Sequence, residues 1–328
     1  MRTYSTLWSC QHCGQQYSCV NGIPRLYIES VVGAKDKELR DKFYNGLLGT
    51  YYQHAMPFLS LPARPGKAYW KGWLVYVLIS LSLISIVGYL IYILLSHGLA
   101  SPTFAQLALL LIVATVGLFF FKHSYLFYLM ILAVPVKISL LANRFRPVAS
   151  FAEIHNNVLR NFLESKETVQ VLDISTGTCN SLYRHGWMKL NAEYTGLDLS
   201  QTMLVQGQKL MAERQVPIDL VLGDSMHLPL QSERFDIVLN YGALNGFTNP
   251  KLALEEMARV TKKGGLLLFL DEQLYDEATF VERIYFNKVL SSHNVIHSCP
   301  REWIPDCVKD IAVYQVYQFY YLCTAYKR

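Results

Sequence analysis

The second half of the chain alternates short apolar runs with longer stretches of mixed composition. The runs span residues 169–174, 194–199, 218–222, 235–240 and 266–270. Because the stretches between them have the length and composition of amphipathic helices, the pattern predicts an α/β domain whose parallel strands are joined by crossover helices. Two more runs, 311–317 and 319–326, follow each other too closely for a crossover helix, so we expect them to pair antiparallel at the sheet edge.

The first half contains two long apolar segments instead. Residues 74–95 and 103–121 are each long enough to cross a bilayer core of about 30 Å as a helix. No Asp, Glu, Lys or Arg occurs between Gly72 and Phe121, and a polar break with Pro102 separates the two segments. The pattern predicts a transmembrane helical hairpin over residues 67–122.

Basic residues set the expected orientation of this hairpin. Arg64, Lys67 and Lys71 precede it and Lys122 follows it, whereas the connecting turn carries no Lys or Arg. Since cytoplasmic flanks are enriched in Lys and Arg, both ends are expected in the cytoplasm. The prediction is a multi-pass protein of a plasma, inner or thylakoid-type membrane, with the lipid bilayer as a partner and the α/β domain in the cytoplasm.

A third apolar segment, residues 124–141, has two open interpretations. It contains Pro135 and Lys137 and lies between Lys122 and Arg144. A third crossing would place the α/β domain on the opposite side of the membrane, against the charge bias. We favour a broken helix in the membrane interface, within residues 123–149, whose basic residues meet lipid phosphates.

Composition agrees with a membrane segment joined to a globular domain. The chain is 52% hydrophobic and 17% charged, whereas soluble globular chains carry about 25% charged residues. Its net charge of +5 comes from the stretch between Lys42 and Ala152, which holds basic residues but no Asp or Glu, so the remainder is net acidic. We therefore expect no nucleic-acid partner. The seven cysteines, an odd number, argue against a disulfide framework.

Acidic residues stand at the ends of the first three predicted strands. The first strand runs into Asp173-Ile-Ser-Thr-Gly-Thr-Cys179, a turn of small residues of the kind that lets backbone approach a ligand. Asp198 ends the second strand, where an acid can accept hydrogen bonds from ribose hydroxyls, and Asp224 follows the third. The pattern is typical of a site for a ribose-containing ligand.

These motifs occur together with the run Asn249-Pro-Lys-Leu-Ala-Leu-Glu-Glu-Met-Ala-Arg-Val-Thr-Lys-Lys-Gly-Gly265. In this order they resemble the class I S-adenosylmethionine-dependent methyltransferases of the ubiquinone/menaquinone-biosynthesis C-methyltransferase type, here with an inserted transmembrane hairpin. The resemblance covers residues 151–328 and, more weakly, residues 43–57. It implies a Rossmann-like sheet, S-adenosylmethionine as the cofactor and methyl transfer as the activity.

The resemblance also implies roles for single residues. The cofactor-binding residues would be Tyr52, Asp173, Ser175, Gly177, Asp198, Leu199, Asp224, Ser225 and Asn240. Asp198 would hold the ribose, and Asp224 with Ser225 would read the adenine amine. A carbon acceptor also needs a base, for which the candidates after the fourth and fifth strands are Tyr241, Asp271 and Glu272. An alternative role for the two acids is to cap the next helix.

One departure from the family pattern concerns the glycine-rich loop. The family has glycine where this chain has Ser175 and Cys179. A β-carbon there can obstruct the close approach that glycine permits, and a non-glycine residue is strained if its φ is positive.

Two functions stay open: a membrane-anchored methyltransferase for a lipophilic acceptor such as a quinone or isoprenoid, or a catalytically inactive, methyltransferase-like subunit of a membrane protein complex.

The N-terminal residues 1–30 resemble a degenerate zinc knuckle. Cys10-Gln-His-Cys13 supplies one Cys-x-x-Cys pair, but a tetrahedral zinc site takes four ligands. Cys19 and His12 are the further ligands that the sequence offers, but we favour a relic hairpin and predict no metal there. Residues 31–66 are expected to form a helical cap, and residues 150–328 the methyltransferase domain.

Overall fold

The computed structural model describes residues 6–9, 14, 16–46, 49, 85, 89, 151–163, 167–317 and 319–328. The predicted hairpin (67–122), apart from Ser85 and Tyr89, lies outside the described residues. The predicted interfacial helix (123–149), Tyr52 and the pair Cys10 and Cys13 lie outside them as well. Among the residues that are described, no helix combines the length and the apolar character that a bilayer crossing requires.

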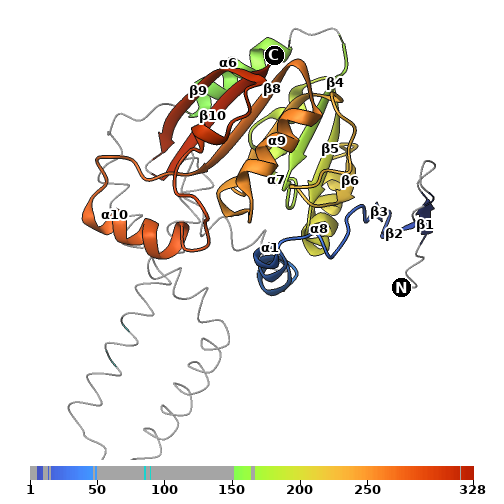
Figure 1. Ribbon diagram of the computed structural model, residues 1–328, viewed down its shortest axis with the longest axis horizontal. Helices are drawn as coiled ribbons and strands as arrows, with labels where there is room; N and C mark the ends of the chain where they lie inside the picture. The colour runs from blue at the N-terminus through green and yellow to red at the C-terminus, as the bar shows by residue number, and fades with distance from the viewer. Residues whose placement is uncertain are drawn as a thin grey trace, which may run out of the picture. The chain divides into compact units, whose positions relative to one another are not determined.

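A mixed seven-stranded sheet of order β6-β5-β4-β7-β8-β10-β9 forms the centre of the domain (Figure 1). Its strands are β4 (Val169–Ile174), β5 (Ala192–Asp198), β6 (Asp219–Leu222), β7 (Phe235–Tyr241), β8 (Thr261–Glu272), β9 (Val308–Tyr317) and β10 (Tyr320–Lys327). Strands β4 to β8 are parallel, and β10 pairs antiparallel with both β8 and β9. The predicted parallel sheet with an antiparallel edge is confirmed.

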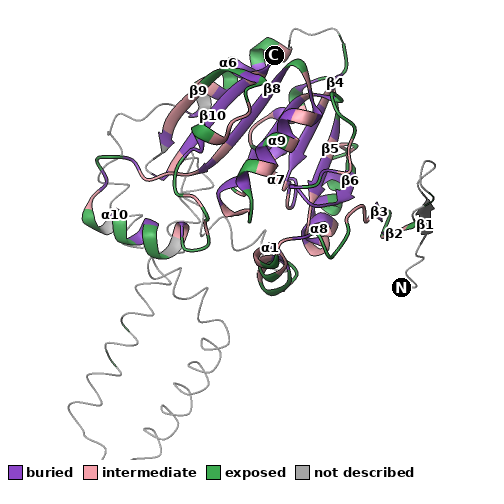
Figure 2. Cartoon of the chain, viewed as in Figure 1, coloured by how far each residue is buried: buried purple, intermediate pink, exposed green. Residues whose placement is uncertain are grey.

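Helices cover both faces of this sheet, and alternate residues of β8 show the two cores. Leu266 and Leu268 pack with α6 (Phe151–Leu163), whereas Leu267 and Phe269 pack with α9 (Pro250–Val260). The other helical segments are α7 (Asn180–Arg184), η2 (Trp187–Lys189), α8 (Gln201–Glu213), η3 (Leu244–Gly246), α10 (Phe280–Tyr285), η4 (Phe286–Leu290) and η5 (Arg301–Trp303). Figure 2 shows the buried strands beside helices that expose their outer faces.

The run from Asn249 to Gly265 forms α9 and the start of β8. Asn249 caps the helix by accepting the Leu252 N–H, and Pro250 occupies the first turn, where its missing N–H is not needed. The sequence pattern placed the following strand at residues 266–270, but β8 begins at Thr261. The pairing with β7 shifts register over this stretch, where Gly264 has a φ of 75°, so the glycine pair forms an irregularity within the strand instead of a turn before it.

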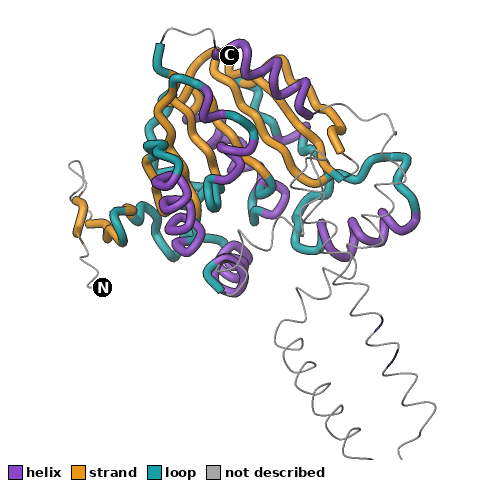
Figure 3. The backbone as a smooth tube through the Cα atoms, turned by 180° about the vertical axis from the view of Figure 1, so that it is seen from behind, coloured by secondary structure: helices purple, strands orange, loops and turns teal. Residues whose placement is uncertain are grey.

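An N-terminal strap, residues 23–46, crosses the carboxyl ends of the parallel strands. It contains β3 (Ile23–Pro24), α1 (Ala34–Leu39) and η1 (Arg40–Tyr44); β3 also closes a small antiparallel sheet with β1 (Thr6–Ser9) and β2 (Gln16–Val20). The strap starts beside β6, where the Leu26 N–H donates to the Leu222 carbonyl at 2.8 Å. Further along, Asp36 accepts hydrogen bonds from the backbone and hydroxyl of Thr248, which lies beyond β7. Figures 1 and 3 show α1 at this edge of the sheet.

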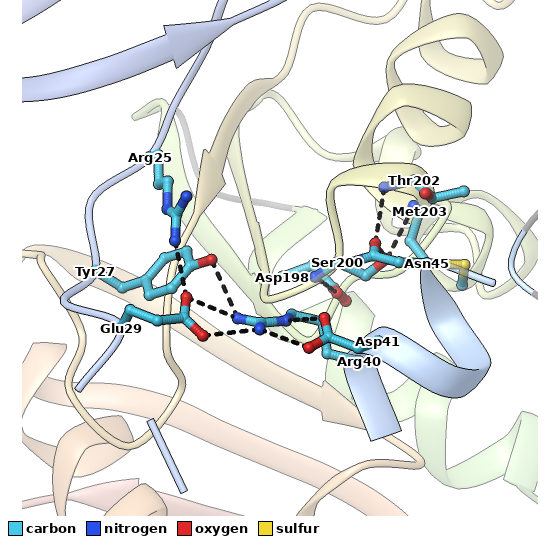
Figure 4. A network of polar contacts seen from close by, with 10 residues as sticks. All are labelled: Arg25, Tyr27, Glu29, Arg40, Asp41, Asn45, Asp198, Ser200, Thr202 and Met203. Atoms are coloured by element: carbon cyan, nitrogen blue, oxygen red, sulfur yellow. Dashed lines mark hydrogen bonds and ion pairs between the residues drawn. The ribbon is translucent and has the colours of Figure 1, made fainter. Parts of the chain in front are cut away.

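Arg40 ties the strap together (Figure 4). Its guanidinium donates to both oxygens of Glu29 (2.8 and 3.1 Å), to both oxygens of Asp41 (2.7 and 3.0 Å) and to the Tyr27 hydroxyl (3.2 Å). Arg25 adds a second pair to Glu29 at 2.8 Å and lies over the Tyr27 ring. Because Arg40 is buried, the two carboxylates offset the loss of its hydration. The strap is therefore a folded part of the domain.

A candidate cofactor site at the carboxyl ends of the strands

The loop after β4 has the backbone path of a glycine-rich turn. Ser175, Gly177 and Cys179 all lie in the left-handed region, with φ of 57°, 56° and 59°. Residues other than glycine are uncommon there because the β-carbon crowds the backbone. The loop thus keeps this path where glycine is replaced, and Ser175 and Cys179 are locally strained.

The side chain of Cys179 lies on the helix side of this loop. It is fully buried in a cluster with Leu204 and Met211 of α8. A β-carbon on Gly207 of the same helix would lie 2.8 Å from the Cys179 sulfur, so the glycine leaves room for the thiol. We expected a side chain at Cys179 to stand in the way of a ligand; the thiol packs against α8 instead.

Ser175 joins this loop to the loop after β6. Its Oγ lies 3.2 Å from the Oγ of Ser225. The neighbouring Asp224 is buried and shapes its own turn: Oδ1 accepts the Met226 N–H at 2.9 Å, and Oδ2 lies 2.9 Å from Nδ1 of His227. Two of the predicted cofactor segments are therefore in direct contact.

Asp198 connects the loop after β4 to the start of α8. Oδ2 accepts the backbone N–H of Gly177 and Oδ1 accepts that of Ser200, both at 2.8 Å. Leu199 is the residue between Asp198 and Ser200 in the chain. Burial raises the pKa of Asp198 to about 6. Since a carboxylate oxygen can accept more than one hydrogen bond, Asp198 retains acceptor capacity for the hydroxyls of a ligand.

Asp173 carries a buried carboxylate oxygen that lacks a partner. Oδ2 accepts the Thr176 hydroxyl at 2.7 Å, whereas Oδ1 has no hydrogen-bond partner among the described residues. The side chain is 1% exposed, and burial raises its pKa to about 7, with a smaller contribution from the charge of Asp198. A buried acceptor without a donor is costly, so this atom is suited to a cationic or N–H group supplied from outside the chain.

Asn240 and Tyr241 end β7 and point to different partners. Asn240 is fully buried; its amide donates to the Ile174 carbonyl at 3.0 Å and accepts the Leu244 N–H at 3.1 Å. It therefore joins the end of β4 to η3.

The Tyr241 hydroxyl lies in an aromatic and histidine cluster beneath α6. It accepts the Trp187 indole N–H at 2.8 Å and lies 3.1 Å from Nε2 of His155, while its ring stacks on His185. Burial lowers the pKa of His155 to about 3 and of His185 to about 4, and it raises the pKa of Tyr241 well above 10. The cluster is therefore neutral at physiological pH.

Asp271 and Glu272 end β8 within a second polar network. Asp271 is 1% exposed, and its two oxygens accept the N–H groups of Asn245 (2.9 Å) and Glu272 (2.8 Å). The Asn245 side chain donates to the Glu272 carbonyl at 2.7 Å and accepts the Tyr321 hydroxyl at 3.1 Å. The Asn294 side chain donates to the Glu272 carboxylate at 3.1 Å. Burial and then the neighbouring Glu272 charge raise the pKa of Asp271 well above its ordinary value.

Known proteins resemble this part of the chain. Residues 172–269 match the family described as a methyltransferase domain. Over these residues the chain is similar to the class I S-adenosylmethionine-dependent methyltransferases. A ubiquinone/menaquinone biosynthesis C-methyltransferase UbiE of Ruegeria sp. is 30% identical over 159 residues, which is 42% of this chain and 64% of that protein. A demethylmenaquinone methyltransferase of Staphylococcus haemolyticus is 32% identical over 124 residues, 37% of this chain and 52% of that protein.

The chain thus spans between half and two thirds of the length of these curated relatives. Among solved structures, the phosphoethanolamine N-methyltransferase 2 of Haemonchus contortus, in complex with phosphomonomethylethanolamine and S-adenosylhomocysteine, aligns with a TM-score of 0.44 at 13% identity. That alignment covers 56% of this chain and 54% of the other. The family match and the curated relatives support S-adenosylmethionine as the cofactor of the methyltransferase domain.

The residues of the methyltransferase domain fit this cofactor. The partnerless Asp173 oxygen suits the ammonium group of the methionine part, and Asp198 retains acceptors for ribose hydroxyls. The thiol of Cys179 packs against α8, and Ser175 is held by Ser225. The structure therefore gathers Asp173, Ser175, Gly177, Asp198, Leu199, Asp224, Ser225 and Asn240 around the ends of β4 to β7. Tyr52 is outside the described residues, so its role stays a prediction.

Several residues of the site had no signal in the sequence. Thr176, His155, Trp187 and Tyr321 each complete a hydrogen bond to a predicted residue or to its network. Asn245 and Tyr321 are 76 positions apart, and Trp187 and Tyr241 are 54 apart. Only the strand order of the methyltransferase domain brings them together.

Replacing Ser175 with glycine is expected to stabilise the methyltransferase domain by about 0.5–1 kcal/mol. The left-handed conformation costs a non-glycine residue about 1–2 kcal/mol, and the greater freedom of glycine in the unfolded chain returns part of this gain. Chemical denaturation measures the change. Ser225→Ala removes the same side-chain contact and leaves φ at residue 175 unchanged, so it should be neutral or slightly destabilising; equal effects of the two variants would contradict a role for backbone strain.

Proposed function

We propose that the protein is a membrane-anchored, S-adenosylmethionine-dependent methyltransferase that acts on a lipophilic acceptor at the cytoplasmic face of the membrane. The observation that carries the proposal is the pair Asp173 and Asp198, at the ends of adjacent strands, with one buried oxygen that lacks a donor. The names of the two relatives support a quinone-type acceptor, and isoprenoid lipids of similar shape belong to the same class.

The proposed anchor is the predicted hairpin of residues 67–122. Two apolar segments of membrane-spanning length, without a charged residue between Gly72 and Phe121, support it, and the basic flanks support a cytoplasmic domain. A plasma or inner membrane, or a thylakoid-type membrane, is the proposed location. A water-soluble acceptor would give no reason for such an anchor, which is why we favour a lipid-soluble one.

The bound cofactor supplies an electrophilic methyl group, and the protein has to hold it in line with the acceptor. Asp173 and Asp198 would hold the methionine part and the ribose of the cofactor, on either side of the sulfonium, so that its orientation is set before the acceptor binds. A carbon acceptor must also lose a proton. Of the candidate bases, Asp271 is enclosed and its oxygens accept two backbone N–H groups, whereas the Glu272 side chain is partly exposed. We therefore favour Glu272 as the base.

Tyr241 has a positioning role in this proposal. Its hydroxyl is engaged by Trp187 and His155, and burial raises its pKa well above 10, so it does not accept a proton near neutral pH. Its ring stacks on His185, which follows α7 and so connects the end of β7 with the segment after the cofactor loop. Tyr241 would keep that segment in place.

Calorimetric titration of the full-length protein in detergent micelles with S-adenosylmethionine tests the proposal. We expect binding, and we expect Asp198→Ala to weaken it by about 1.5–3 kcal/mol, which is roughly 10- to 150-fold, the scale of charged hydrogen bonds. Asp219→Ala is the matched control, because Asp219 is an exposed acid at the first position of β6, at the opposite end of the sheet. Equal loss in both variants would rule out a specific role for Asp198.

The second candidate function is a catalytically inactive subunit of a membrane protein complex. The replacement of glycine at Ser175 and Cys179, both at positive φ, favours it. Absence of S-adenosylmethionine binding by the folded wild-type protein would overturn the enzymatic proposal and leave this one. Binding together with methyl transfer to a prenylated quinone would exclude it.

A further inference from the structure

Large apolar side chains are exposed mainly at one edge of the described domain. Nine such side chains are exposed among the described residues, and six of them lie on segments that follow or cover the carboxyl ends of the parallel strands. These six are Ile28, Val31, Tyr44, Phe280, Ile284 and Val295. We call this set the apolar edge. Single exposed apolar residues are common, whereas a cluster marks a contact surface.

Helix α10 presents the most exposed part of the apolar edge. Phe280 is 77% and Ile284 is 42% exposed, and residues four apart lie on the same face of a helix. The other side of the same helix is fixed to the domain, because Tyr285 and Phe286 are buried against Phe319 at ring distances of 5.7 and 6.4 Å. The exposed face is therefore held rigidly outward. Figures 1 and 3 show α10 beyond the same edge of the sheet as α1.

Charge on this helical segment is positive on its outer side. Between Phe280 and Leu290, Arg283 and Lys288 are exposed. Glu282 is the single acidic residue of the segment, and it is buried, where it completes the capping box with Thr279. An exposed apolar stripe beside basic residues is the pattern of helices that lie in the interface of an anionic membrane.

The described domain is joined to the uncharged stretch of the sequence at this same edge. Before this stretch the chain is still in contact with the domain at Gly49, whose carbonyl accepts the Gln206 side-chain N–H, and at Asn45, which accepts the Ser200 hydroxyl at 2.8 Å at the start of α8. It re-enters at Phe151, whose ring lies 4.8 Å from His185, which in turn stacks on Tyr241 at the end of β7. The sequence between these points includes residues 72–121, without a formal charge.

The geometry points to the apolar edge as a surface that rests on the lipid bilayer, with Phe280 and Ile284 among the lipid chains and Lys288 facing lipid phosphates. This inference rests on the proposed function, since it assumes that the hairpin anchors the protein in a membrane. Its consequence is that the carboxyl ends of the strands, and with them the cofactor site, open toward the membrane, so a lipophilic acceptor would enter from the lipid phase.

Fluorescence quenching by lipids tests this surface in the full-length protein. Cys10, Cys13 and Cys307 are first replaced with serine. An environment-sensitive dye is then attached to Phe280→Cys or, as the matched control, to Ile311→Cys. Ile311 is 41% exposed but lies on the outer strand β9, toward the opposite end of the sheet. The proteins are reconstituted in vesicles of equal parts phosphatidylcholine and phosphatidylglycerol, with and without lipids that carry quenchers on their acyl chains.

We expect severalfold stronger quenching at position 280 than at position 311, and weaker quenching at 280 after Lys288→Glu. Equal quenching at the two positions would overturn the inference. The dye at residue 280 could instead show a blue-shifted emission that the quenching lipids do not change and that vanishes when the protein is diluted among vesicles. That result would overturn the inference and indicate a second copy of the chain on this face. Unlabelled Ile284→Glu gives an independent readout, because it should slow methyl transfer to a membrane-embedded quinone more than to a short-chain quinone.

Cofactor titration of the same labelled proteins separates this inference from the proposed function. Binding of S-adenosylmethionine without preferential quenching at 280 leaves the methyltransferase proposal in place and removes the docking surface. Preferential quenching without cofactor binding removes the enzymatic proposal and retains the docking surface. Both variants must show the same near-ultraviolet circular dichroism as the wild type, which establishes that the labels have not unfolded the domain.

Discussion

Replacing Asp173 with asparagine is expected to stabilise the cofactor-free protein above neutral pH and to weaken cofactor binding at least tenfold. The native pKa of Asp173 is about 7, against an ordinary value of 3.8. Between these two values the native state binds a proton that the unfolded state has released, so stability falls as the pH rises through this window. Each pKa unit corresponds to about 1.4 kcal/mol, and the amide that replaces the carboxylate lacks this penalty.

The expected net gain in the free energy of unfolding is about 2 kcal/mol near pH 8. It is smaller than the full penalty on the carboxylate because the new amide N–H₂ has no acceptor in that position. Near pH 4, where wild-type Asp173 is protonated in the folded protein, only the cost of the unpaired amide remains, so the variant should be less stable than wild type by about 2 kcal/mol. Urea unfolding followed by circular dichroism at both pH values measures this difference. Asp219→Asn, at an exposed position, serves as the control and should change neither stability nor its pH dependence. A variant that shows the wild-type pH dependence would mean that Asp173 is ionised in the native protein.

Replacing Asn245 with alanine is expected to destabilise the domain by about 3–5 kcal/mol. Its side chain is fully buried and connects the Glu272 carbonyl (2.7 Å) with the Tyr321 hydroxyl (3.1 Å). Alanine leaves both groups buried without a partner, and each such group costs about 1–3 kcal/mol. Since the loop that holds Asn245 also lies against the base candidates, methyl transfer should fall together with stability.

A double-mutant cycle identifies the cause. Tyr321→Phe removes the hydroxyl that Asn245 accepts, so Asn245→Ala should cost about 1–2 kcal/mol less in the Tyr321→Phe background than in the wild type. Additive costs would show that the two residues do not share an interaction. Denaturant midpoints of the four proteins supply the measurement.

The sheet could be predicted because each of its strands contains a short, mainly apolar run. In β4, Val171 and Leu172 face opposite sides of the sheet and are both fully buried, which is the reason that the run shows no polar alternation. The start of β8 was missed because Lys262 to Gly265 has the composition of a turn, and only the irregular pairing with β7 makes it part of the strand.

The acids of the site could be predicted from their positions at strand ends, but their partners could not. Asp173 and Asp198 follow apolar runs that are visible in the sequence, whereas Thr176 becomes their neighbour only through the left-handed turn at Ser175. The strap is another example. Nothing in its sequence marks Asp36 as a partner of Thr248, because that contact depends on the strap crossing the sheet.

The strap also has a consequence for the order of events during synthesis. Asp36 and Thr248 are separated by 212 positions, which a ribosome adds in about 10–40 s at about 5–20 residues per second. The strap therefore emerges long before its docking surface exists, and the uncharged stretch follows it out of the ribosome before any strand of the large sheet. In the proposed membrane-anchored protein, insertion of the hairpin would precede closure of the domain. The strap would be the last element to dock during folding and the first to detach during local unfolding.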